Sequence, residues 1–178
     1  MTKEFVILVD TNDNELGKME KIQAHKKALL HRAISVFIVN SHGEWLLQRR
    51  ALHKYHSNGL WTNTCCSHQR VGETNIQAGR RRLREEMGFE TDLSELFSFI
   101  YKAPFDNGLT EHELDHVLLG YYSGSPDINP DEVAAWKWMG LDEIRQELEE
   151  SPDNYTAWFR IIFNRFYEYI RQNKGKTL

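Results

Sequence analysis

Residues 67–89 read SHQRVGETNIQAGRRRLREEMGF, the most informative stretch of the chain. We expect Asn75–Met87 to form a helix, because Gly88 follows in the position that a helix C-terminus prefers. Glu85 and Glu86 lie near that C-terminus, where the helix macrodipole disfavours negative charge. The stretch therefore combines a regular helix with an unusual arrangement of charge.

Opposite charges on this helix are spaced so that they can pair. Arg81 and Glu85 are four residues apart, as are Arg82 and Glu86, and each such pair stabilises a helix by a few tenths of a kcal/mol. Two interpretations follow. The helix is either a charged, solvated surface helix or a set of carboxylates that holds Mg²⁺ on a diphosphate, with arginines meeting the phosphate oxygens.

Outward from this helix, apolar runs and turn residues predict alternating strands and helices. Strands are expected at Phe5–Val9, Ala33–Val39, Trp45–Arg49, Leu60–His68, Leu96–Tyr101, Glu113–Tyr122 and Ala134–Met139. Further helices are expected at Met19–Leu30, Asp142–Glu150 and Tyr155–Gln172, and a turn at residues 10–17. This order predicts an α/β (α+β) sandwich that forms one domain over residues 1–178.

Composition excludes several classes of protein. The 178 residues carry 22 Lys and Arg against 26 Asp and Glu, a net charge of −4, which argues against a nucleic-acid partner. The longest apolar stretch, Ala33–Val39, is far too short to span a membrane. No signal peptide is evident at the N-terminus, so we expect a cytoplasmic protein. The neighbouring Cys65 and Cys66 cannot easily close a disulfide, which excludes a secreted disulfide framework.

Alternation along strands predicts two further groups of functional side chains. Cys66 and His68 are two residues apart and share a face, with Cys65 on the other. Glu111 and Glu113 also share a face, and paired carboxylates repel unless a positive charge lies between them. Histidine and carboxylate ligands suit Mn²⁺, Zn²⁺ or Fe²⁺. The alternative interpretation is a solvated acidic strand.

The stretch from Ser67 to Phe89 resembles a degenerate Nudix box. It keeps the first Glu, the Arg, the paired Glu and the closing Gly of that motif, at Glu73, Arg81, Glu85, Glu86 and Gly88. It departs from the motif at Ser67, where the box opens with Gly, and at Arg82, where a hydrolase has another Glu. Because that Glu serves metal binding or water activation in a hydrolase, the resemblance predicts a Nudix-like fold without a hydrolase box.

Other motifs, in order along nearly the whole chain, resemble type I isopentenyl-diphosphate Δ-isomerase, a family with the same fold. They are Met19-Glu-Lys-Ile-Gln-Ala-His25, Gln48-Arg-Arg-Ala-Leu52, Trp61-Thr-Asn-Thr-Cys-Cys-Ser-His68 and Glu111-His-Glu113. The resemblance implies a mixed sheet flanked by helices. It also implies an enzyme that interconverts isopentenyl diphosphate and dimethylallyl diphosphate by adding and removing a proton.

The resemblance also implies the roles of individual residues. A site for Mn²⁺ or Zn²⁺ is implied at His25, His31, His68, Glu111 and Glu113, with His116 as the alternative to His31. Glu86 is implied to hold the Mg²⁺ that accompanies the substrate diphosphate. The implied catalytic residues are Cys66, Glu113 and Tyr101. The implied substrate-binding residues are Lys21, Arg50, Lys54 and Arg82 for the diphosphate, and Trp158 for the hydrocarbon.

Two other functions stay open at this point. A Nudix hydrolase of nucleoside diphosphates would share the Glu85–Glu86 helix, although Arg82 counts against it. A non-catalytic binding module stabilised by a structural metal would unfold when the metal is removed. The expected partner is a small-molecule diphosphate, and the sequence leaves monomer and homodimer open.

Overall fold

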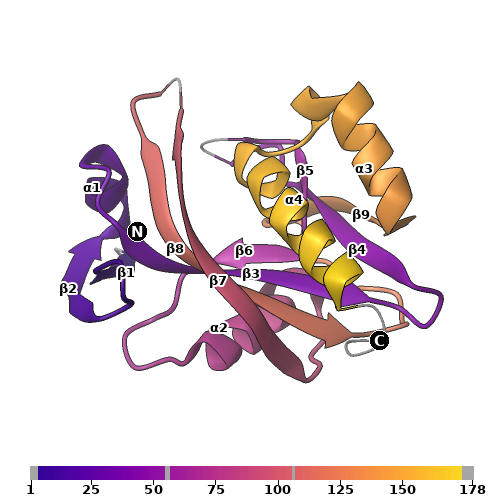
Figure 1. The fold of residues 1–178 in the computed structure, drawn as a ribbon, viewed down its shortest axis with the longest axis horizontal. Coiled ribbons are helices and arrows are strands. Elements are labelled where there is room, and N and C mark those ends of the chain that lie inside the picture. Colours follow the sequence, from indigo (N-terminus) through magenta and orange to yellow (C-terminus); the bar gives the residue numbers. More distant parts are fainter. Residues whose placement is uncertain (1–3, 55–56, 106, 174–178) are drawn as a thin grey trace.

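The computed structural model describes residues 4–54, 57–105 and 107–173 (Figure 1). The strands are β1 (Phe5–Val9), β2 (Glu15–Glu20), β3 (His31–Val39), β4 (Glu44–Arg50), β5 (Trp61–Thr62), β6 (Cys65–Ser67), β7 (Leu93–Pro104), β8 (Thr110–Tyr121) and β9 (Val133–Gly140). The helices are α1 (Lys21–Lys26), α2 (Asn75–Arg82), the π-helical turn η1 (Leu83–Met87), α3 (Leu141–Glu150), the 3₁₀ turn η2 (Pro152–Asn154) and α4 (Ala157–Gln172).

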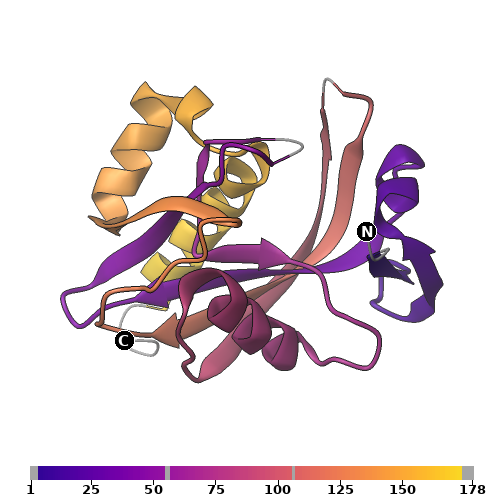
Figure 2. The same ribbon diagram turned by 180° about the vertical axis from the view of Figure 1, so that it is seen from behind.

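Strand β3 organises a mixed sheet. It pairs in parallel with β8 along its whole length, from His31 opposite Glu113 to Val39 opposite Tyr121. It also pairs antiparallel with β1, β4 and β6, while β7 and β8 form a long antiparallel hairpin. Helices cover this sheet on both faces (Figures 1 and 2), so the predicted α+β fold with a mixed sheet is confirmed.

The two faces of β3 contribute to two separate hydrophobic cores. Phe37 and Val39 pack in the core that contains the apolar side of α4, including Phe159 and Phe166. Ile34, Val36 and Ile38 belong to the core beneath α2. Alternate residues of a strand point to opposite faces, so one strand supports both layers. The predicted apolar side of the last helix is confirmed, with Ile162, Phe163 and Ile170 also buried there.

Three predicted elements differ from the observed ones. Glu15–Glu20 is a strand rather than a turn, and the first helix begins only at Lys21, because the Glu20 side chain caps it by accepting hydrogen bonds from the Ile22 and Gln23 amides. The expected strand Leu60–His68 is interrupted at residues 63–64. There the Asn63 side chain donates to the Val36 and Cys65 carbonyls, replacing ladder hydrogen bonds.

The helix of residues 75–87 is also not uniform. It is α-helical to Arg82 and then widens into η1, a type of turn that is frequent at functional sites. It ends at Gly88, whose φ of +72° suits glycine. A Cβ at this position would lie 2.3 Å from the Asp127 carbonyl oxygen, so glycine is required for close packing as well.

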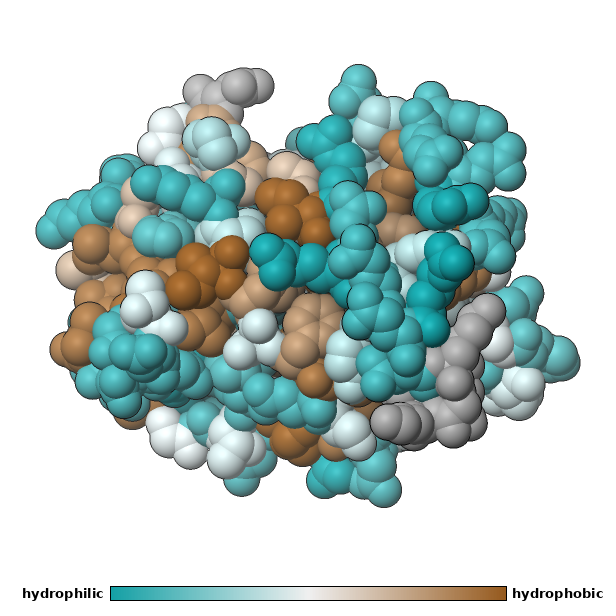
Figure 3. Space-filling view, in the orientation of Figure 1, coloured by the Kyte–Doolittle hydropathy of each residue, from teal (hydrophilic) through white to brown (hydrophobic). Residues whose placement is uncertain are grey.

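The surface of the molecule is uneven in polarity. Hydrophilic residues cover much of the face formed by α3 and α4, while hydrophobic residues gather at the centre and left of the view (Figure 3). Among the described residues, no helix has both the length and the apolar character needed to cross a bilayer.

Candidate active site

One cavity of about 570 Å³ collects the residues that the sequence singled out. Its lining includes Lys21, His25, Arg50, Lys54, Cys66, His68, Arg82, Glu86, Tyr101, Glu111, Glu113 and Trp158. His31 is completely buried and lies directly behind this lining, with its Nε2 3.5 Å from Glu113 Oε1. Segments that are distant in sequence therefore converge at one end of the sheet.

Four side chains in or directly behind the cavity lining form a compact cluster. Nitrogen atoms of His25, His31 and His68 and a carboxylate oxygen of Glu113 all lie within 4.8 Å of one another. The His25 and His31 ring centroids are 4.9 Å apart, and those of His31 and His68 are 5.0 Å apart. The register of β3 and β8 explains part of this, because His31 lies directly opposite Glu113.

Backbone carbonyls fix the orientation of two of these rings. His25 Nδ1 lies 2.6 Å from the Lys21 carbonyl oxygen, and His31 Nδ1 lies 2.8 Å from that of Leu29. A carbonyl only accepts, so each Nδ1 carries the proton and each Nε2 presents a lone pair. Among the described residues, the buried His31 Nε2 has no hydrogen-bond partner. This arrangement is typical of histidines that ligate a metal.

A tyrosine hydroxyl bridges the two carboxylates that lie beside the histidines. The Tyr101 hydroxyl lies 2.6 Å from Glu113 Oε2 and 3.2 Å from Glu111 Oε2, and His68 Nε2 lies 3.0 Å from Glu113 Oε1. Burial and the nearby Glu113 raise the pKa of Glu111. Burial acts in the same direction on Glu113, but contacts with His31 and His68 outweigh it and hold the pKa of Glu113 below its usual range.

These donors fit a divalent metal ion. Burial lowers the pKa of His25, and lowers that of His68 to about 4, so both rings are neutral near pH 7 and can act as ligands. Neutral imidazoles with an ionised carboxylate form a donor set that suits borderline divalent ions. The orphaned His31 Nε2, buried among them, supports the same conclusion. Glu111 lies at the edge of the cluster and reaches Glu113 through Tyr101.

Cys66 lies on the same face of the sheet as this cluster. Its Sγ donates to Asn63 Oδ1 at 2.9 Å and lies 3.3 Å from Ser35 Oγ, which donates to Asp115 at 2.7 Å. Burial and the Asp115 charge raise the pKa of Cys66. Cys65 is completely buried in the opposite core beneath α2, so the predicted alternation is confirmed.

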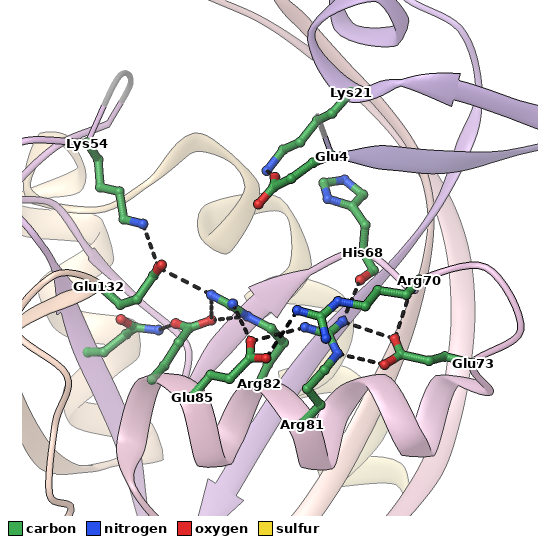
Figure 4. Close-up of polar contacts among 12 residues, drawn as sticks. Glu4, Lys21, Lys54, His68, Arg70, Glu73, Arg81, Arg82, Glu85 and Glu132 are labelled. Carbon is green, nitrogen blue, oxygen red and sulfur yellow. Dashed lines mark hydrogen bonds and ion pairs between the residues drawn. The ribbon is translucent and has the colours of Figure 1, made fainter. Parts of the chain in front are cut away.

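The helix of the first motif presents a network of ion pairs beneath the cavity (Figure 4). Arg81 Nε and Nη2 contact the two Glu73 oxygens at 2.7 and 3.0 Å, and its Nη1 contacts Glu85 at 3.1 Å. Arg82 contacts Glu86 at 2.6 Å and Glu85 at 2.7 Å. Both predicted i,i+4 pairs are confirmed. Arg82, which replaces the hydrolase glutamate, itself neutralises the paired glutamates.

Comparison with known proteins agrees with this geometry. The NUDIX domain model matches residues 29–159. The "Isopentenyl-diphosphate Delta-isomerase" of Pectobacterium atrosepticum is 51% identical over 171 residues, which cover 96% of each chain. The "Isopentenyl-diphosphate Delta-isomerase 2" of Aromatoleum aromaticum is 50% identical over 160 residues, 90% of this chain and 85% of the relative. The chain belongs to the isopentenyl-diphosphate Delta-isomerase family, within the Nudix fold.

Solved structures extend this relationship at the level of the fold. A Deinococcus radiodurans protein superimposes with a TM-score of 0.76 at 20% identity, covering 92% of this chain and 99% of its own. A MutT protein from Methanosarcina mazei has a TM-score of 0.65 at 20% identity, over 82% of this chain and 96% of its own. At such identities the likeness shows the Nudix fold and nothing about the reaction.

The alternative in which His116 replaces His31 as a metal ligand is wrong. His116 differs from Glu113 in strand parity and therefore points to the other face of β8. Its Nδ1 contacts Glu95 at 2.5 Å and its Nε2 lies 3.2 Å from Asp13, away from the histidine cluster. The cluster contains His31 instead.

Several residues of the isomerase cavity escaped the sequence analysis. Gln48 donates to Glu86 Oε2 at 2.7 Å, and Glu132 accepts from Lys54 at 2.5 Å. Ser35 and Asn63 hold the Cys66 thiol. Gln48 and Asn63 lie inside quoted motifs but were given no role, whereas no local pattern distinguishes Ser35 or Glu132 from surface residues. The position of Ser35 follows from the register that places it opposite Cys66.

Proposed function

We propose that this chain interconverts isopentenyl diphosphate and dimethylallyl diphosphate. The observation that carries the proposal is that Cys66 and Glu113 line one cavity with basic residues and a buried tryptophan, Trp158. The family relationship supports the same reaction, because the relatives of about 50% identity bear the isomerase name. The cavity therefore combines groups for proton transfer with groups for a diphosphate.

The reaction demands an acid and a base in a site that excludes water. A proton adds to the terminal carbon C4, the double bond moves from C3–C4 to C2–C3, and a proton leaves C2. An alkene is a very weak base, and water would trap the tertiary cation that protonation creates. Cys66 and Glu113 divide the acid and base roles. Both groups are shielded from bulk solvent, since Cys66 is only partly exposed and Glu113 is only 6% exposed.

Two aromatic side chains assist these groups. Tyr101, which contacts Glu113 Oε2 at 2.6 Å, orients that carboxylate and helps to hold a proton there. The ring of Trp158 lines the cavity and would face the hydrocarbon of the substrate, and its indole Nε1 donates to Thr62 Oγ1 at 3.1 Å. An aromatic face stabilises a neighbouring cation by about 1–2 kcal/mol. Trp158 is fixed in place and therefore suited to that role.

Two kinds of divalent ion accompany the proposed reaction. His25, His31, His68, Glu111 and Glu113 would hold Mn²⁺ or Zn²⁺, which when bound supplies positive charge that tunes the acidity of the Glu113 carboxyl. Glu86 would contact the Mg²⁺ that arrives with the substrate diphosphate. Lys21, Arg50, Lys54 and Arg82 bind the diphosphate oxygens, and this remote contact supplies binding energy for the reacting carbons.

The hydrolase alternative receives less support. A hydrolase needs a further glutamate on the helix of residues 75–87 for metal binding or water activation, whereas this chain has Arg82 there, which contacts both Glu85 and Glu86. The test is direct. The purified protein is incubated with isopentenyl diphosphate, Mg²⁺ and Mn²⁺ or Zn²⁺, and dimethylallyl diphosphate is measured by NMR. Phosphate release from nucleoside diphosphates without allylic product would support the hydrolase and contradict the proposal.

A further inference from the structure

Glu132 occupies a central place among the cations of the cavity, and the sequence analysis assigned it no role. It lies directly before β9, and its Oε2 accepts from Lys54 Nζ at 2.5 Å and from Arg82 Nη2 at 3.2 Å. Figure 4 shows both side chains pointing toward this carboxylate from different elements. One carboxylate oxygen therefore lies where two proposed phosphate-binding cations meet.

The backbone of Glu132 is anchored on both sides of this meeting point. Its carbonyl accepts from the Ala51 amide at 3.0 Å, at the start of the loop that carries Lys54. Its amide donates to the Asn129 carbonyl at 2.9 Å, and the Asn129 amide donates to the Glu86 carbonyl at 3.0 Å. The side chain is 26% exposed and so can exchange partners at the cavity surface. The carboxylate is thus placed by the fold rather than by chance.

The positive charge near this point is already neutralised by carboxylates. Arg82 already contacts Glu85 and Glu86 as well as Glu132, so three carboxylates share it. A phosphate oxygen that approaches Lys54 and Arg82 must come close to the Glu132 carboxylate. Two anions that lie close together repel strongly in a partly desolvated site. A divalent cation carried by the phosphate removes this repulsion.

We propose that Glu132 makes the cavity select the Mg²⁺-complexed diphosphate against the free diphosphate. The inference deepens the proposed function and rests on it. An unfavourable charge placed against one ligand form is a common route to specificity, since specificity is a difference between two affinities. Glu132 is therefore a specificity-determining residue, and its carboxylate also keeps Lys54 and Arg82 together before substrate arrives.

The experiment measures the binding of inorganic pyrophosphate by calorimetry, with and without Mg²⁺. The protein used already carries Mn²⁺ or Zn²⁺ at its His/Glu site. In the wild-type protein Mg²⁺ should tighten binding strongly. Glu132→Gln should bind free pyrophosphate about tenfold tighter than wild type, with less than about threefold change for the Mg²⁺ complex, because only the free anion is repelled. Glu132→Asp keeps the charge and should retain most of the Mg²⁺ effect.

The matched control is Glu147→Gln on α3, which removes a carboxylate from a comparable pair with Lys137 at 3.1 Å, outside the cavity. It should leave the Mg²⁺ effect unchanged. If folded Glu132→Gln bound free and Mg²⁺-complexed pyrophosphate equally more weakly than wild type, Glu132 would have a purely positioning role and the inference would be overturned. Unchanged binding of both forms would also overturn it. The binding readout needs no turnover, so failure of the isomerase assay is distinguishable from failure of this inference.

Discussion

Two acidic regions border the same cavity, and they are neutralised in opposite ways. In the segment that resembles the Nudix box, residues 67–89, Glu73, Glu85 and Glu86 each accept hydrogen bonds from Arg81 or Arg82. On β8, Glu111 and Glu113 instead both contact the Tyr101 hydroxyl, and Glu113 also contacts His68, whose pKa is lowered by burial. The first region is neutralised by arginines of the chain itself. The second brings imidazole nitrogens and a carboxylate to one point, a donor set that suits a divalent cation.

Secondary structure accounts for this difference. On a helix, residues four apart are neighbours, so Arg81 meets Glu85 and Arg82 meets Glu86 within a single motif. On a strand, residues two apart are neighbours, so Glu111 and Glu113 meet each other and like charges accumulate. Similar acidic residues thus form an internal ion-pair network in one region and a candidate metal site in the other.

Among the changes that test this contrast, removal of metal should have the largest effect on activity. Thorough chelation is expected to abolish turnover while far-UV circular dichroism stays largely unchanged, because a core of this size folds without a metal. Titrating Mn²⁺ or Zn²⁺ back should restore activity. Loss of the circular dichroism signal on chelation would instead identify the cluster as a structural metal site.

Glu113→Gln and Glu111→Gln test whether the two β8 carboxylates are equivalent. Glu113 lies within the four-residue cluster and is also assigned a proton, so Glu113→Gln should lower kcat by about 10²–10⁴-fold even at saturating metal. Glu111→Gln should weaken metal binding, with activity partly recovered in excess metal. Metal affinity by calorimetry and kcat separate these effects. Equal recovery of both variants would show that Glu113 has no separate chemical role.

The adjacent cysteines extend the comparison to the two faces of the sheet. Cys66→Ala should fold, retain metal and lose about 10²–10³-fold in kcat, because a group for proton transfer is gone. Cys65→Ala should keep most activity and lose about 1–2 kcal/mol of stability, as a small buried hydrophobic residue would. Turnover and urea unfolding check both. Normal activity in Cys66→Ala with loss in Cys65→Ala would contradict the assigned role.

Much of this contrast was predictable from sequence because it depends on short-range periodicity. The ion pairs of Arg81 and Arg82 follow from helical spacing, and the opposed directions of Cys65 and Cys66 follow from strand alternation. Those signals need only the local backbone conformation. The fold class was predicted correctly for the same reason.

The prediction of element boundaries failed where side chains form hydrogen bonds with the backbone. The Glu20 cap shortened the first helix, and Asn63 interrupted a strand, although both positions lie within apparently regular patterns. Glu132 and Ser35 acquire their contacts only through long-range register. The choice between His31 and His116 likewise depended on tertiary pairing, since His31 lies opposite Glu113 only through the parallel pairing of β3 and β8.

The smallest expected effect concerns the stability of the box network. Arg82→Gln leaves Glu86, which is 5% exposed, with Gln48 but without its ionic partner, and should cost about 2 kcal/mol of unfolding free energy. Arg80→Gln is the matched control, because Arg80 is 43% exposed and pairs with Asp92, which is 99% exposed. An exposed pair contributes about 0–1 kcal/mol. If urea unfolding showed the same loss of unfolding free energy for both variants, the buried ion pair of Arg82 would not stabilise the helix more than an exposed pair does. The contrast with β8 would then fail.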